Sequence, residues 1–324
     1  MSRTIPTLLA LGLAALVALP AAGAGSLERI RANHELVLGF IAGDAPFTDG
    51  DEKQASGYGI DLCQAVATEL RKDPALAQLQ TRYKPVSLEQ ALDSVSSGQV
   101  DLLCSPLVET LQRRETVSFS LPVTTAGIGV ILRSDAPADL RDALSGAPRE
   151  RGPTWRGTIN QGLSKRTFAV IKGTLSADWA RQRIRELSLQ SQLVEVANYD
   201  DGVQQLLVRR IDAFFGDRLS LQNYQAREAK AEQLQVSPRI FEAAHASLAL
   251  ARGDDDFRLR VDRALSQAMR GDMGVALYTR YFGTAATAPA ALQRALRRAW
   301  SVNPGERFFT HRGHALRHSE SAPL

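Results

Sequence analysis

Strand and helix patterns alternate along this chain, and they do so twice, which constrains the fold more than any other feature of the sequence. In the first half, short aliphatic and β-branched segments alternate with segments whose apolar residues recur at helical spacing. The expected strands are 35–40, 81–85 and 100–104, and the expected helices are 60–70 and 88–95. This order is typical of an α/β sheet with parallel crossovers. We therefore expect one α/β unit here.

The same order returns in the second half of the chain. The expected strands are 167–171, 193–196 and 211–215, and the expected helices are 176–186 and 201–208. A final block follows, with a strand at 247–251 and helices at 256–269 and 275–282. Because this block has no sheet partner nearby in sequence, we assign it to the first unit. The chain then crosses twice between two lobes.

This arrangement predicts a signal peptide, two lobes and a basic tail. Their bounds are 1–24 for the signal peptide, 27–125 and 246–284 for the first lobe, 126–245 for the second lobe and 285–324 for the tail. Residues 134–164 are rich in Pro, Gly, Arg and Asp, which predicts an irregular insertion in the second lobe. The crossings place hinges near 123–127 and 241–245.

The two ends of the chain predict export and a solvated basic segment. Arg3, the apolar run 8–19 and Ala22-Gly23-Ala24 are typical of a signal peptide cleaved after Ala24. The run is shorter than the roughly 20 apolar residues that span a bilayer, so we expect a periplasmic protein. Much of the basicity behind the net charge of +4 lies near the C-terminus. Such a tail can bind lipid, nucleic acid or protein, but we interpret it as a solvated end and expect no nucleic-acid partner.

Polar residues that follow the expected strands define a candidate site, because open α/β sheets bind ligands beyond the carboxyl ends of their strands. Arg113 can bind a carboxylate through two parallel hydrogen bonds. The helix that begins after Thr174 adds N–H donors. Asp217 can accept hydrogen bonds from an ammonium group. Together these residues predict a site for a small zwitterion.

Several segments resemble the bacterial extracellular solute-binding family for polar amino acids. They are 57–63 after the first strand, the SGxxD-like 97–102, the TxxR…FS-like 110–120, and 173–174, 212–217 and 251–254 in the later part. The resemblance runs from about residue 35 to Phe282. It implies the two-lobed periplasmic-binding-protein fold, with two chain crossings between the lobes.

The resemblance also implies a function and a set of contacts. The protein would bind an amino acid in the periplasm and deliver it to the membrane permease of an ABC importer, as a monomer without cofactor or metal. Arg113 would bind the α-carboxylate and Asp217 the α-ammonium. The full predicted set is Asp44, Phe47, Ser105, Val108, Thr110, Arg113, Thr174 and Asp217.

Some positions depart from the family pattern. Pro106 and Val108 stand where many relatives have hydroxyl or small residues before the arginine, which removes one expected contact to the carboxylate. Asp44 stands where an aromatic side chain often lies over the ligand, and a carboxylate there suits a cationic side chain. Relatives that bind glutamate or aspartate have basic residues near the end of the first strand, whereas residues 40–43 have none, so the resemblance implies that an acidic ligand is less favoured.

Cys63 and Cys104 are the only cysteines of the chain. An even pair in an oxidising compartment favours a disulfide, and two buried thiols are the alternative. In the fold that the resemblance implies, Cys63 lies on the first helix and Cys104 at the end of the third strand, which are neighbours. We therefore expect a disulfide and no metal.

Two other functions compete with transport. A periplasmic dehydratase resembling cyclohexadienyl dehydratase would need an acid or base beside the leaving group, and Asp44 could serve. No second placed group, Ser-His-Asp set or zinc-ligand spacing accompanies it in the sequence, so we expect no enzyme. The other alternative is a ligand-sensing subunit, which the presence or absence of a neighbouring importer operon would distinguish.

Overall fold

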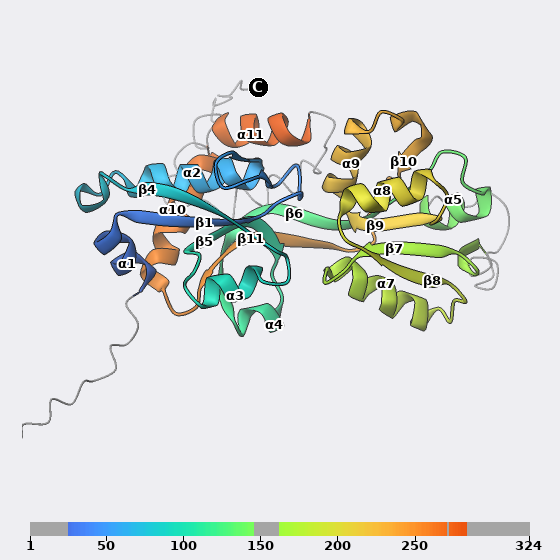
Figure 1. The fold of residues 1–324 in the computed structure, drawn as a ribbon, viewed down its shortest axis with the longest axis horizontal. Helices are drawn as coiled ribbons and strands as arrows, with labels where there is room; N and C mark the ends of the chain where they lie inside the picture. Colours follow the sequence, from blue (N-terminus) through green and yellow to red (C-terminus); the bar gives the residue numbers. More distant parts are fainter. Residues whose placement is uncertain (1–24, 146–161, 271, 284–324) are drawn as a thin grey trace, which may run out of the picture.

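The computed structural model describes residues 25–145, 162–270 and 272–283. The predicted signal peptide (1–24) and basic tail (285–324) lie outside the described residues, as do residues 146–161 of the predicted insertion. Among the helices of the described part, none is both long and apolar enough to cross a membrane. Two α/β lobes lie side by side and are joined by long strands (Figure 1).

The first lobe is a parallel sheet, extended by the strands that cross between the lobes, with helices on both faces. Its elements are α1 (Ser26–Asn33), β1 (Glu35–Ile41), β2 (Asp49–Gly50), β3 (Ala55–Ser56), α2 (Tyr58–Leu70), η1 (Pro74–Leu76), β4 (Gln80–Val86), α3 (Ala91–Ser96), β5 (Leu102–Val108), α4 (Leu111–Arg114), α10 (Asp255–Arg270) and α11 (Asp272–Phe282). β1 lies parallel to β4 and β5. Leu36, Leu38 and Phe40 of β1 pack in one apolar cluster with α2 and α10. Val37 and Ile41 pack in another with α3. Coverage of both faces explains why this strand has no charged or polar side chain after Glu35.

The second lobe repeats this arrangement. Its elements are α5 (Ala138–Ser145), β7 (Thr167–Ile171), α7 (Leu175–Glu186), β8 (Gln192–Val196), α8 (Tyr199–Leu207), β9 (Ala213–Asp217), α9 (Arg218–Arg227), η2 (Ala231–Gln233) and β10 (Leu234–Val236). β7 lies between β8 and β9, parallel to both. Phe214 of β9 packs with α8, and the next residue, Phe215, packs with α7. Successive side chains of β9 therefore point to helix layers on opposite faces of the sheet, as in the first lobe.

Two long strands connect the lobes. β6 (Val117–Arg133) pairs with β11 (Ala243–Ala251) on the side of the first lobe and with β9 on the side of the second. The sheet is thus continuous, in the order β4-β1-β5-β11-β6-β9-β7-β8. Residues 124–127 pair with 243–246, so the two expected hinge segments lie against each other. The predicted α/β fold with two crossings is confirmed, whereas the exact lobe boundaries stay a prediction.

In each lobe, one aspartate forms the same pair of hydrogen bonds with a residue of a neighbouring strand. The backbone N–H of Asp101 donates to Val37 O at 2.9 Å, and its carboxylate accepts from Val37 N at 2.8 Å. In the second lobe, Asp212 N donates to Thr167 O at 2.7 Å, and its carboxylate accepts from Thr167 N at 2.8 Å. The internal repetition read from the sequence therefore extends to individual hydrogen bonds.

The structure differs from the sequence prediction at several segments, of which two show a clear physical reason. β5 begins at Leu102 and not at residue 100, because Asp101 bonds to β1 as just described. The insertion expected to be irregular over 134–164 contains the helix α5, whose Leu140 and Leu144 are buried in a core cluster of the second lobe. Buried leucines at i and i+4 stabilise a helix in a segment whose composition suggested a loop.

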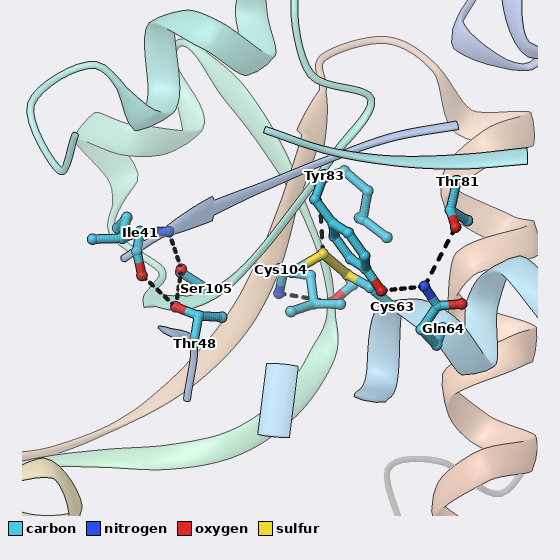
Figure 2. Close-up of a disulfide and its surroundings, with 11 residues drawn as sticks. Ile41, Thr48, Cys63, Gln64, Thr81, Tyr83, Cys104 and Ser105 are labelled. Carbon is cyan, nitrogen blue, oxygen red and sulfur yellow. Dashed lines mark hydrogen bonds between the residues drawn. A yellow bond between two sulfur atoms is a disulfide. The ribbon is translucent and has the colours of Figure 1, made fainter. Parts of the chain in front are cut away.

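The predicted disulfide is confirmed. Cys63 of α2 and Cys104 of β5 are bonded, with an S–S distance of 2.10 Å, and both residues are fully buried. Figure 2 shows Tyr83 and Gln64 beside them. The bond ties α2 to β5, the strand whose far end leads to Arg113.

Candidate functional site

The carboxyl ends of β5 and β9 both reach the strands that cross between the lobes. Val108, the last residue of β5, pairs with Ala246, which in turn pairs with Thr124 of β6. Asp217, the last residue of β9, pairs with Ile128 of the same β6 strand. Four residues of a strand span about 13 Å. The loop after β5 and the loop after β9 therefore lie on opposite sides of a short interval of β6, residues 124–128.

Arg113 lies on the first-lobe side of this interval. It belongs to α4, which follows β5 after two residues and is capped by Thr110, whose Oγ1 accepts from Arg113 N at 3.2 Å. Arg113 Nη1 donates to Val108 O at 2.7 Å, which anchors the guanidinium to the end of β5. Burial lowers the pKa of Arg113 and the charge of Asp178 on α7 raises it. The influence of the Asp178 charge indicates that Arg113 lies near the start of α7 in the second lobe.

Thr174 begins α7 on the opposite side. Its Oγ1 donates to Ile171 O at 2.7 Å and accepts from Ala177 N at 3.3 Å, so the hydroxyl acts as a helix cap. The first N–H groups of a helix have no acceptor within it and attract anions. Because Asp178 lies in the first turn of α7 and interacts with Arg113, the structure brings this helix start and Arg113 to the same region.

Asp217 lies where β9 meets α9 and the crossing strand. Its Oδ1 caps α9 by accepting from Leu219 N at 2.9 Å and Ser220 N at 3.1 Å. Its Oδ2 accepts from Gly127 N of β6 at 3.2 Å. Burial raises the pKa of Asp217, and the backbone donors oppose that shift. The carboxylate is therefore held rigidly beside the crossing.

Asp44 of the first lobe approaches Asp217 of the second. It lies in a tight turn in which Asp44 O accepts from the N–H groups of Phe47 and Thr48 at 2.9 and 3.1 Å. Burial, then the charge of Asp217, then that of Asp49, raise the pKa of Asp44 well above its ordinary value. A carboxylate whose pKa is raised by a second carboxylate nearby favours a cation beside it. The structure thus brings together two predicted site residues from different lobes.

Ser105 and Phe47 have structural partners for their side chains. Ser105 Oγ accepts from Ile41 N at 2.8 Å and bonds to Thr48 Oγ1 at 2.6 Å, and Thr48 Oγ1 donates to Ile41 O at 2.7 Å (Figure 2). Phe47 is 5% exposed, and its ring packs on that of Phe282. Both residues support the turn that carries Asp44, and the predicted direct ligand contacts at these positions remain untested.

Two tyrosines of the second lobe were missed by the sequence reasoning. Tyr199 Oη accepts from Asp217 N at 3.1 Å, and its ring stacks on Tyr224 with a centroid distance of 5.1 Å. Tyr224 Oη donates to Gly43 O of the first lobe at 2.8 Å. No sequence signal identified them, because each is one buried residue of a helix and the bond from Tyr224 to Gly43 forms only between the lobes.

The arrangement offers opposite charges at its two ends. Arg113 and the start of α7 suit an anion, whereas Asp44 and Asp217 suit a cation. A group of three or more His, Cys, Asp or Glu that could hold a metal is not found in the described part of the chain. Groups of opposite charge placed in this way can recognise a small molecule that carries both charges.

The sequence of this chain is similar to those of known binding proteins. Residues 36–284 match the sequence model of the bacterial extracellular solute-binding proteins, family 3. The L-cystine-binding protein TcyJ of Escherichia coli K12 is 24% identical over 267 residues, which cover 81% of this chain and 88% of that protein. The L-glutamate/L-aspartate-binding protein of Pseudomonas aeruginosa is 23% identical over 288 residues, which cover 86% and 88%.

Solved structures share the fold. An ancestral amino acid-binding protein, described as a precursor of cyclohexadienyl dehydratase, aligns with a TM-score of 0.63 and 22% identity over 80% of this chain and all of that one. A mutant of ArgBP from T. maritima aligns with a TM-score of 0.62 and 19% identity over 79% of this chain and 99% of that one. Two-lobed amino-acid-binding proteins are therefore structural neighbours of this chain.

Proposed function

Because this chain belongs to the bacterial extracellular solute-binding proteins of family 3, we propose that it binds a free amino acid between its lobes and delivers it to the permease of an ABC importer. The single observation that supports this best is the placement of opposite charges at the two strand ends. Arg113 follows β5 on one lobe, and Asp217 ends β9 on the other. An amino acid has a carboxylate for Arg113 and an ammonium group for Asp217.

The carboxylate end of the ligand meets Arg113 and the N–H groups that begin α7. A guanidinium forms two parallel charge-assisted bonds with a carboxylate, and a helix start adds donors in a favourable dipole. The hydrogen bond from Arg113 Nη1 to Val108 O, at 2.7 Å, supports this role because it restricts the side chain before the ligand arrives. Less conformational entropy is then lost on binding.

The ammonium end meets Asp217, with Asp44 close by. Two carboxylates exceed the one positive charge of an α-ammonium group, so the site favours ligands with a neutral or cationic side chain over acidic ones. The curated relatives described above bind L-cystine or L-glutamate and L-aspartate, as their names state. We propose that Asp44 directs this chain away from the acidic class.

Export and delivery complete the proposal. Residues 1–24 act as a signal peptide that is cleaved after Ala24, and the mature protein works in the periplasm. It acts without turnover of its ligand. The dehydratase alternative has one neighbour in its favour, the ancestral precursor. Incubation of the pure protein with prephenate and arogenate distinguishes the two functions, because only an enzyme forms product.

A thermal-shift screen against the twenty amino acids tests the proposal. A ligand that binds only the folded state at 100 times its Kd adds about 2.7 kcal/mol to the free energy of unfolding. We expect at least one neutral or cationic amino acid to raise the melting temperature, with micromolar or tighter binding confirmed by calorimetry. Absence of any shift, for protein refolded to remove pre-bound ligand, would reject amino-acid binding.

A further inference from the structure

We propose that Tyr224, stacked on Tyr199, is a positioning residue that docks the turn carrying Asp44 onto the second lobe and so holds Asp44 beside Asp217 when the lobes close. The role in ligand binding rests on the proposed function, whereas the contacts between the lobes do not. They are made by protein groups alone.

A chain of contacts leads from Asp217 to the turn. Tyr199 Oη accepts from Asp217 N at 3.1 Å, which fixes the phenol at the end of β9. The rings of Tyr199 and Tyr224 lie 5.1 Å apart and are inclined by only 19°. Tyr224 Oη then donates to Gly43 O at 2.8 Å. Gly43 directly precedes Asp44, so the two tyrosines set the spacing between the two carboxylates.

Apolar packing accompanies this hydrogen bond. Ala45, although it belongs to the first-lobe turn, is 8% exposed and lies in the apolar cluster of the second lobe that contains Tyr199 and Tyr224. The turn is therefore inserted into the other lobe on both sides of Asp44. Separation of the lobes would expose Ala45 and break the bond between Tyr224 and Gly43.

The first lobe prepares the turn for this docking. Thr48 Oγ1 and Ser105 Oγ tie its far end to β1, and Gly43 N donates to an oxygen of Asp49 at 3.1 Å. A turn that is already ordered in the open state loses little entropy on closing. Tyr224 therefore has to fix only the orientation of this turn relative to the second lobe.

A matched pair of variants tests the role. Tyr224→Phe removes one phenol hydrogen bond between lobes and keeps the ring. Tyr281→Phe removes the phenol hydrogen bond from Tyr281 Oη to Asp61, at 2.8 Å, within the first lobe. Since a net hydrogen bond changes an equilibrium about two- to tenfold, we expect Tyr224→Phe to lower the ratio of closed to open protein by that factor and Tyr281→Phe to leave it unchanged.

The measurement is the distance between two spin labels in the ligand-free protein. Both native cysteines are bonded to each other, so cysteines introduced at exposed Lys53 in the first lobe and Lys230 in the second label cleanly. The probe for binding is whichever of L-arginine, L-cystine and L-glutamine the unmodified protein binds. Its Kd should rise about two- to tenfold in Tyr224→Phe.

Each outcome decides the question. An unchanged distance distribution in Tyr224→Phe, or equal opening in Tyr281→Phe, overturns the docking role. A shifted distribution with unchanged Kd overturns the positioning role. If Tyr224→Phe does not fold, Ala45→Gln, which overfills the same docking contact, must open the lobes or the proposal fails. If the unmodified protein binds no probe, the proposed function is in question while the label distances still test the docking.

Discussion

Replacement of Arg113 by alanine removes the anion-binding end of the proposed site. The guanidinium has five N–H donors, and one of them already donates to Val108 O at 2.7 Å. The remaining edge can form a two-bond fork with a carboxylate. A hydrogen bond to a charged group is worth about 1.5–3 kcal/mol, so the fork is worth about 3–6 kcal/mol. The Kd should then rise about 10²- to 10⁴-fold.

Arg113→Lys refines this expectation. Lysine keeps the positive charge but cannot form the planar fork, so the loss should be close to that of one bond, about ten- to a hundredfold in Kd. The assay is isothermal titration of refolded protein with the amino acid found in the thermal-shift screen. Both variants should unfold at temperatures near that of the unmodified protein, because Arg113 belongs to a short surface helix.

Arg114 provides a control on the same helix. Its side chain is 57% exposed and pairs with Glu109 on the surface, and exposed ion pairs contribute about 0–1 kcal/mol. Arg114→Ala should therefore bind with a Kd within about fivefold of the unmodified protein. The reasoning is refuted if Arg113→Ala binds as tightly as the unmodified protein, or if Arg114→Ala loses as much affinity.

Three further predictions concern stability and pH. Replacing Cys63 and Cys104 by alanine opens a loop of 41 residues. In the chain-entropy estimate this should lower the free energy of unfolding by about 4 kcal/mol. Urea denaturation measures this change, and a loss below about 1 kcal/mol would contradict the prediction. Burial and the charge of Asp217 raise the pKa of Asp44 above 3.8, so the folded state binds its proton more tightly than the unfolded state. Stability of the ligand-free protein should thus fall as pH rises from 3.8 through the raised pKa, and Asp44→Asn should raise the melting temperature at pH 7; a lower melting temperature would show that the charge is well compensated. The affinity for the ligand should change with pH in the opposite direction to the stability, because protonation of Asp44 and Asp217 removes the charges that attract the ammonium group. Affinity should therefore fall as the pH falls through the raised pKa values of these two residues. An affinity that does not change with pH would argue against either group as a contact.

Much of the sheet could be predicted because its strands are buried on both faces. The segment at β7, for example, is apolar at every position after its first and matches its predicted bounds, Thr167–Ile171. The disulfide followed from an even cysteine count and the neighbouring positions of the two residues in the expected fold. Local pattern and topology were sufficient in both cases.

The strand β6 was not predicted, for a physical reason. Over Val117–Arg133 it leaves one core and enters another, so its middle residues are only half-buried and carry no clear alternation. Pro122, Gly127 and Gly129 weaken the pattern further. α9 was missed in a similar way, because only Ser220, Leu221 and Tyr224 of its ten residues are buried.

The candidate site was predicted in part. Arg113, Thr174 and Asp217 could be proposed from their positions after strands, since the carboxyl ends of parallel strands share one edge. The proximity of Asp44 to Asp217 and the bond from Tyr224 to Gly43 depend on how the two lobes meet. No local pattern encodes that relation, so these features required the structure.

A crystal structure of the protein with its amino acid tests the central claim most directly. Two ligand carboxylate oxygens should lie about 3 Å from the guanidinium nitrogens of Arg113. The ligand ammonium nitrogen should lie at a similar distance from an oxygen of Asp217. A ligand bound with its ends reversed, or on one lobe without contact to either residue, would contradict the account.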